Sequence, residues 1–203
     1  ILYWRYMTAS TIPSIGIDFG GTSIKMGVVK GAEVIAHAPS IATQEYGNPD
    51  QLIEAIAQFV NMLRLNHPEV QAIGMGMPGF VNFYQGTVYT PGWNNVPVRD
   101  MLQAACGLPV YVENDANCMA YAEWKLGAGK GKRHLVCLTL GTGVGSGLIV
   151  NGELLRGSTC SAGELGQTSI DYRGRLGHYG NRGSLEDYVG NREIAADART
   201  LYA

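Results

Sequence analysis

The most constraining feature of this sequence is a pattern that occurs twice. Residues 14–33 read as an apolar strand, a glycine-threonine turn, a second apolar strand and a polar turn, and residues 137–153 repeat that order. Glycine lets backbone N–H groups approach a phosphate closely, and threonine adds a hydroxyl donor, so each turn can form an anion-binding concavity. Either copy alone could be a plain hairpin turn. The repetition favours two phosphate-binding lobes that face one nucleotide.

Strands follow the glycines of both turns, whereas a P-loop or Rossmann turn opens a helix. The turn residues are Gly20, Gly21 and Thr22 in the first copy and Gly141, Thr142 and Gly143 in the second.

Two other glycine-rich segments are weaker candidates. Residues 74–79 match the dinucleotide-binding fingerprint, but aromatic and β-branched residues follow at 80–89, so we expect a hairpin where the fingerprint requires a helix. Residues 127–133 resemble a Walker loop, but no serine or threonine follows either lysine. We interpret this segment as a linker and leave open a secondary contact with phosphate.

Composition excludes several classes of partner. The 203 residues carry 15 basic and 17 acidic side chains, a net charge of -2, which argues against a broad nucleic-acid or anionic-membrane surface. No apolar run is long enough for a membrane span, and the opening residues are too short for a signal peptide, so we expect a cytoplasmic protein. The four cysteines lie far apart, which favours buried, reduced thiols.

The remaining pattern alternates strands and helices. Asn48, Pro49 and Asp50 form a helix start, and apolar residues at three- and four-residue spacing follow over 52–63. Buried strands are expected at 72–77 and 108–112, a helix after Asp115 and another around 194–201.

The duplicated pattern resets near Asn117. We therefore expect one lobe over residues 14–117 and a second over 118–203. Residues 1–13 are interpreted as an extension outside the fold, introduced by cloning or by translation upstream of Met7.

The hairpins and three further boxes, at 113–117, 163–166 and 183–186, together resemble the ROK family of bacterial sugar kinases such as glucokinase, which also includes repressors. The resemblance covers residues 14 to about 190, and the boxes are specific as a set. It implies an α/β fold of the actin-like ATPase, ribonuclease-H-like type, with duplicated lobes and the nucleotide and sugar bound between them. Family members continue for a further stretch that carries the adenosine pocket, so the second lobe is expected to be incomplete. Either the chain is a fragment or a partner chain completes it, and we expect a homo-oligomer, a dimer.

The resemblance implies ATP- and magnesium-dependent phosphorylation of a hexose, with glucose and its exocyclic hydroxyl as the first candidate. Asp115, at a strand end before a helix, is the expected general base, and a helix cap is its structural alternative. Asp18, at the end of the first strand, would hold Mg²⁺ directly or through water, and an Asx-turn is its alternative.

Polar residues in the boxes are implied to bind the sugar hydroxyls. They are Asn114, Asp115, Glu164 and Glu186, followed by Gly79, Thr90, Asn94 and Gln167. Glu164 and Glu186 could equally be surface carboxylates. Side-chain types alone do not choose among glucose, mannose, fructose and N-acetylated hexosamines, or between ATP and polyphosphate.

The chain departs from the resembled family at its zinc site. There, a histidine and three cysteines bind a structural zinc, whereas this sequence has Gln167, Gly177, Tyr179 and Ser184. A lone His178 cannot replace a tetrahedral set of four nitrogen or sulfur ligands, so we expect no zinc. The Gln167 amide can still hydrogen-bond a sugar hydroxyl.

Two other functions compete with the kinase. A sugar-sensing repressor is disfavoured, because about a dozen residues precede the first strand and basic residues are few. A non-catalytic, sugar-binding fragment without the adenosine lobe stays open.

Overall fold

The computed structural model describes residues 12–43 and 48–202. The chain divides into two compact units, Ile1–Asp115 and Ala116–Ala203, and each is described here by itself. The sequence placed the boundary near Asn117, two residues after the division in the structure. Almost all of the N-terminal extension lies outside the described residues.

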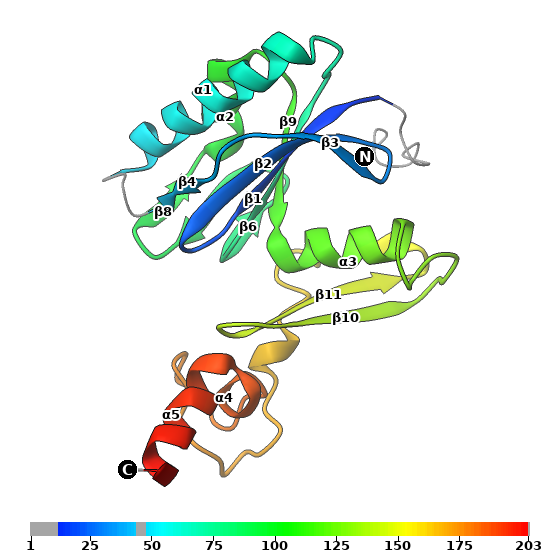
Figure 1. Cartoon of the computed structure of the whole chain (residues 1–203). Coiled ribbons are helices and arrows are strands. Elements are labelled where there is room, and N and C mark those ends of the chain that lie inside the picture. Colours follow the sequence, from blue (N-terminus) through cyan, green and yellow to red (C-terminus); the bar gives the residue numbers. More distant parts are fainter. Residues whose placement is uncertain (1–11, 44–47, 203) are drawn as a thin grey trace. The chain divides into compact units, whose positions relative to one another are not determined.

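The first unit is built on a six-stranded mixed sheet in the order β3-β2-β1-β5-β9, with β4 paired to β2 (Figure 1). The strands are β1 (Ser14–Phe19), β2 (Ser23–Lys30), β3 (Glu33–His37), β4 (Ile41–Ala42), β5 (Ile73–Met77) and β9 (Val110–Asn114). β1, β5 and β9 run parallel, while β2 runs antiparallel to β1. Alternate residues of β1 are buried in the core, as expected for a strand packed on one face.

Helices α1 (Pro49–Asn66) and α2 (Val98–Cys106) lie together on one face of this sheet (Figure 1). α1 begins as predicted, because Asn48 Oδ1 accepts a hydrogen bond of 2.9 Å from the Gln51 amide. Its predicted apolar stripe faces the core. Arg64 Nη1 donates to the carbonyl of Cys106 at 2.7 Å and so joins α1 to the end of α2.

A three-stranded meander follows β5. It consists of β6 (Phe80–Asn82), β7 (Thr87–Thr90) and β8 (Trp93–Val96), all antiparallel. β6 and β7 form the hairpin expected after Gly79, and this confirms that residues 74–79 do not open a dinucleotide-binding helix.

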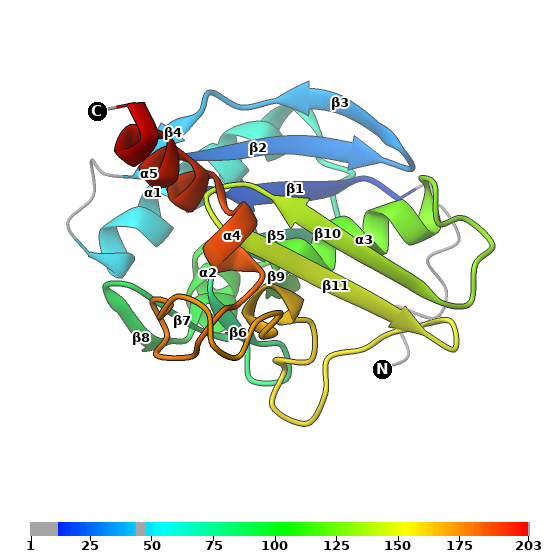
Figure 2. The same ribbon diagram turned by 90° about the horizontal axis from the view of Figure 1, so that it is seen from below.

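The second unit contains α3 (Asp115–Lys125), whose first residue closes the first unit, and the antiparallel strands β10 (Leu135–Leu140), β11 (Val144–Val150) and β12 (Glu153–Leu154). The expected second hairpin is β10 and β11, paired in register from Leu135 with Ile149 to Leu140 with Val144. Beyond the sheet lie the short helix η3 (Leu165–Gln167), α4 (Glu186–Val189) and α5 (Asn191–Tyr202), the last two visible in Figure 2.

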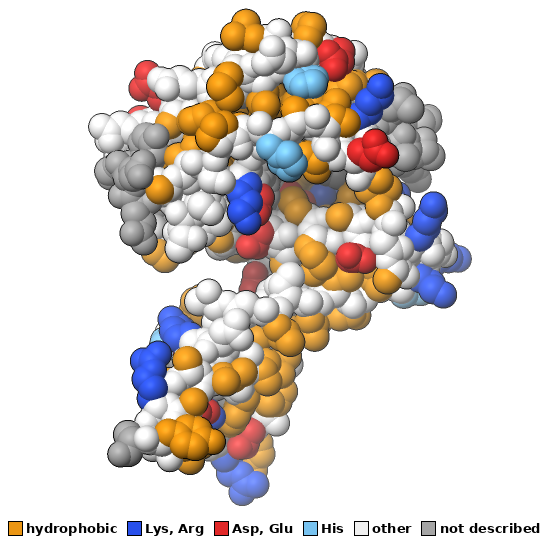
Figure 3. Space-filling view, in the orientation of Figure 1, with side chains coloured by type: hydrophobic (Ala, Val, Ile, Leu, Met, Phe, Trp, Pro, Cys, Tyr) orange, Lys and Arg blue, Asp and Glu red, His pale blue; other side chains and the backbone are white. Residues whose placement is uncertain are grey.

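One face of β10 is apolar and exposed. Val136, Leu138 and Leu140 alternate along the strand and are 59%, 48% and 65% exposed. Hydrophobic side chains gather over this part of the second unit in Figure 3. β10 is also an edge strand of its sheet. We call these three residues the open face of β10.

None of the helices in the described part of the chain has the length and apolar character that a membrane span requires.

Candidate functional site

In the first unit, three parallel strands bring predicted site residues to one edge of the sheet. Asp18 on β1 lies beside Gly76 on β5, and Met77 on β5 lies beside Asn114 on β9. Asp115 follows Asn114 directly and is exposed. Ligands in open α/β sheets bind at the carboxyl ends of the strands, so this edge is the candidate site of the first unit.

Three predicted sugar-binding residues meet at this edge. Asn114 Nδ2 donates to the carbonyl of Gly79 at 3.1 Å. A Cβ on Gly79 would lie 2.6 Å from the carbonyl oxygen of Tyr89 and 3.0 Å from Thr90 Cβ. The turn after β5 is therefore pressed against the end of β7. Asn94, also predicted, lies on β8 and is exposed.

Asp115 is the first residue of α3, so its carboxylate lies at the positive end of the helix dipole. Its exposure leaves it accessible to a substrate. Directly before it, the side chain of the buried Glu113 accepts the Asn114 amide at 3.0 Å.

The first glycine-threonine turn is closed by its own backbone and by a residue that the sequence reasoning missed. Gly20 N–H donates to the Ser23 carbonyl at 3.0 Å. Thr43 donates its amide to the Thr22 carbonyl at 3.1 Å and its hydroxyl to the Gly20 carbonyl at 3.0 Å. No local sequence signal marks Thr43, since its partners lie more than 20 positions away. Gly21 and Thr22 remain exposed, as does Asp18 at the end of β1.

The second turn contacts a carboxylate. Glu186 Oε2 accepts the Val144 amide at 2.8 Å, and a Cβ on Gly143 would collide with the same carboxylate. The turn is also held by the Asn191 amide, which donates to the Gly141 carbonyl at 2.9 Å. The Glu186 carboxylate, predicted to bind sugar, thus accepts a hydrogen bond from an amide at the edge of the turn that is predicted to bind phosphate.

The box at 163–166 packs along β11. The hydroxyl of the buried Ser146 bonds the carbonyl of Gly163 and accepts the Leu165 amide at 3.0 Å. This placement leaves Glu164 exposed and Gln167 half-buried. Ser146 was also missed, although a serine inside an apolar strand is a signal of a buried hydrogen bond.

The predicted site residues fit magnesium but not zinc, the two metals to be tested after the family resemblance. A single carboxylate such as Asp18 suits Mg²⁺, which keeps several waters and is held mainly by substrate phosphates. The zinc positions do not fit, because Gly177 offers no ligand and a Cβ there would lie 2.5 Å from Asp187 Oδ2. Among the described residues, no group of three or more His, Cys, Asp or Glu side chains could hold a metal.

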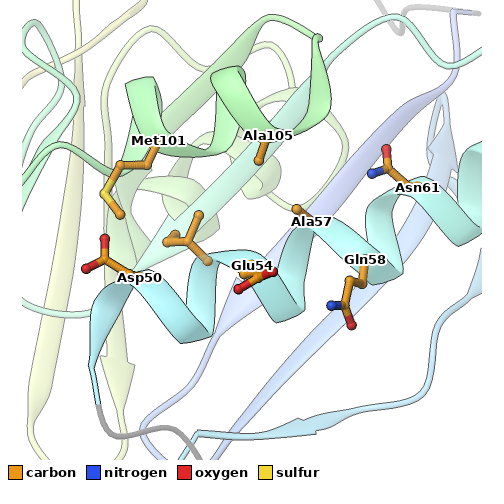
Figure 4. Close-up of a pocket in the computed structure, with 8 residues that line it drawn as sticks. Asp50, Glu54, Ala57, Gln58, Asn61, Met101 and Ala105 are labelled. Carbon is orange, nitrogen blue, oxygen red and sulfur yellow. The ribbon is translucent and has the colours of Figure 1, made fainter.

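A groove of about 350 Å³ lies elsewhere, between α1 and α2 (Figure 4). Its lining includes the carboxylates of Asp50 and Glu54 and the side chain of Met101. None of the predicted site residues lines it, so we assign it no part in the site.

Comparisons with known proteins agree with the resemblance in the sequence. Residues 14–201 match the model of the ROK family. A glucokinase of Streptomyces coelicolor is 39% identical over 189 residues, which are 92% of this chain and 59% of that protein. The chain therefore spans about three fifths of the length of this relative.

Solved structures give the same result. A ROK hexokinase from Thermus thermophilus superposes with a TM-score of 0.84 at 33% identity, covering 94% of this chain and 64% of that one. A ROK family glucokinase from Streptomyces griseus, solved with glucose and AMPPNP, gives a TM-score of 0.78 at 35% identity, covering 93% and 60%. These matches confirm the expected α/β fold of the actin-like ATPase type for the part that the chain covers.

Proposed function

The chain is a member of the ROK family, and we propose that it phosphorylates a hexose with ATP, glucose being the first candidate. The observation that carries this proposal is the cluster of Asn114, Gly79 and Thr90 beside Asp115 at the carboxyl ends of parallel strands. The cluster offers amide, carbonyl and hydroxyl groups for sugar hydroxyls, next to an exposed carboxylate. Similarity to a glucokinase and to a structure with glucose and AMPPNP supports it.

In the proposed reaction, Asp115 accepts the proton of the exocyclic hydroxyl. The freed oxygen forms a bond to the γ-phosphorus of ATP, the bond from that phosphorus to the β,γ-bridging oxygen breaks, and ADP leaves. Asn114 orients the sugar, because its own side chain is held by the Gly79 carbonyl.

Charge on the phosphates must be neutralised for this transfer. Asp18 would hold a magnesium ion, which supplies that neutralisation when bound. Each of the two glycine-threonine turns, at residues 20–22 and at 141–143, has backbone amides of the kind that bind phosphate.

An assay of hexose-dependent ADP release tests the proposal. Asp115→Asn should lower kcat by about 10²- to 10⁴-fold, the usual contribution of a positioned base. Its sugar binding should persist, measured as the thermal shift that a bound sugar produces. Asp100→Asn, which removes an exposed carboxylate on α2, is the matched control and should keep full activity.

The sugars tested should include glucose, mannose, fructose and N-acetylated hexosamines, each with ATP and with polyphosphate as the phosphate donor. Absence of turnover by the unmodified chain with every pair would overturn the kinase proposal. A sugar-induced thermal shift without turnover would instead identify a sugar-binding, non-catalytic chain.

A further inference from the structure

The segment of residues 169–184, here called the 169–184 loop, raises a physical problem. It contains only two isolated β-bridges, Ser169 with Ser184 and Leu176 with Arg182. Ordering such a segment costs conformational entropy that some set of contacts must offset. The family resemblance implies a structural zinc at this place, but Gln167, Gly177, Tyr179 and Ser184 of this chain do not form a set of zinc ligands.

An arginine joins the loop to α5. Arg175 donates from Nη1 and Nη2 to the two carboxylate oxygens of Asp197, both at 3.0 Å. Its guanidinium also lies over the ring of Tyr188 on α4, 4.7 Å from the centroid. The hydrogen bond to Asp197 is the main reason that the pKa of Arg175 is raised. A two-pronged pair fixes direction as well as distance, which a single exposed ion pair does not.

A histidine–carboxylate hydrogen bond and a buried pair reinforce this attachment. His178 Nε2 lies 2.9 Å from Glu193 Oε1 on α5, and this hydrogen bond lowers the pKa of Glu193. Ser184 and Asp187 are buried and exchange hydrogen bonds, the Ser184 amide to Asp187 Oδ2 and the Asp187 amide to Ser184 Oγ. These reciprocal hydrogen bonds join the end of the loop to α4.

The loop reaches Gln167, one of the predicted sugar-binding residues, through Asn181. Its Nδ2 donates to the carbonyl of Gln167 at 2.9 Å. Any motion of the loop that displaces Asn181 therefore removes a hydrogen bond from Gln167.

We propose that hydrogen bonds and ion pairs to α4 and α5, chiefly Arg175 with Asp197, hold the 169–184 loop without a metal, and that Arg175 is thereby a positioning residue for Gln167. The attachment of the loop without a metal is inferred only from its contacts with α4 and α5. The effect on sugar rests on the proposed function.

Amide hydrogen exchange of the loop tests the attachment without reference to activity. The Gly183 amide donates to the Arg175 carbonyl at 2.8 Å and the Gly177 amide to the Asn181 carbonyl at 2.9 Å, so both report on loop opening. Arg175→Met should speed exchange of peptides in the loop by about threefold to tenfold. Arg173→Met is the matched control, because that guanidinium lies over Tyr172 of the same loop, and it should leave exchange unchanged.

A charge exchange distinguishes a specific pair from general damage. Arg175→Asp and Asp197→Arg should each speed exchange, and the double variant should restore much of the protection. Failure of Arg175→Met to change exchange, or of the double variant to restore it, would overturn the proposal. A chelator that speeds exchange in the unmodified chain, or added zinc that slows it, would also overturn it.

Steady-state kinetics distinguish this proposal from the kinase proposal. With an active chain, Arg175→Met should raise the KM for sugar about threefold to tenfold with kcat largely unchanged, and Arg175→Lys should recover only part of this loss. An unchanged KM would overturn the positioning role. Absence of turnover in the unmodified chain would count against the kinase proposal alone, and the exchange result would stand.

Discussion

Gly79 is the residue on which the geometry of the first unit's site depends most directly. Its φ of +84° is in the region that favours glycine, and its carbonyl accepts Asn114 Nδ2. The end of β7 leaves no room for a side chain there. One residue thus fixes the turn after β5 and orients a predicted sugar-binding amide.

Gly79→Ala is expected to destabilise the first unit more than Gly92→Ala. Gly92 has nearly the same φ of +85°, but nothing lies within 4 Å of its added Cβ. Backbone strain of about 1–2 kcal/mol is common to both, and crowding adds about 1–3 kcal/mol at Gly79 alone. Urea unfolding of the two variants measures the difference. Equal losses would show that the contact with β7 does not constrain the turn.

At the scale of secondary-structure elements, α1 shows how much of a helix can be predicted from its local sequence. Its capping residue, its proline and its apolar stripe were all predicted from adjacent residues, and the structure confirms them. The hairpins also followed from local alternation and turn chemistry.

Contacts between distant elements could not be predicted in the same way. Glu186 meets the Val144 amide across 42 positions, and Thr43 reaches Gly20 across 23. A carboxylate in a glycine-rich box has the same sequence appearance whether it binds sugar or an amide. The sequence therefore identified the residue types at the candidate site, and tertiary packing decides their partners.

Replacement of the α1 cap should have a measurable and local cost. Asn48→Ala removes the acceptor of the Gln51 amide and should lower the free energy of unfolding by about 0.5–2 kcal/mol. Asn48→Ser, which keeps a capping oxygen, should lose much less. Thermal unfolding followed by circular dichroism compares the two, and equal stability of the alanine variant and the parent would contradict the cap assignment.

At the scale of the whole molecule, the open face of β10 governs the expected behaviour in solution. An edge strand with unpaired backbone groups and alternating apolar side chains is a template for pairing with another chain. The 203-residue chain is therefore expected to self-associate through β10, in line with the oligomer expected from the sequence.

Leu138→Lys should shift this equilibrium toward monomer, because a charge on the open face of β10 opposes its burial. Leu65→Lys is the control, since Leu65 is 83% exposed on α1 and belongs to another surface. Sedimentation velocity across a concentration series measures both. A parent chain that stays monomeric up to about 100 μM would refute the expectation.

The Asp187 carboxylate beside Gly177 also limits what position 177 can accept. A Cβ there would lie 2.5 Å from Asp187 Oδ2, so a side chain at 177 would have to displace that carboxylate. Displacement would weaken the hydrogen bond that Asp187 Oδ2 accepts from the Ser184 amide. A substitution at position 177 would therefore be transmitted to the start of α4.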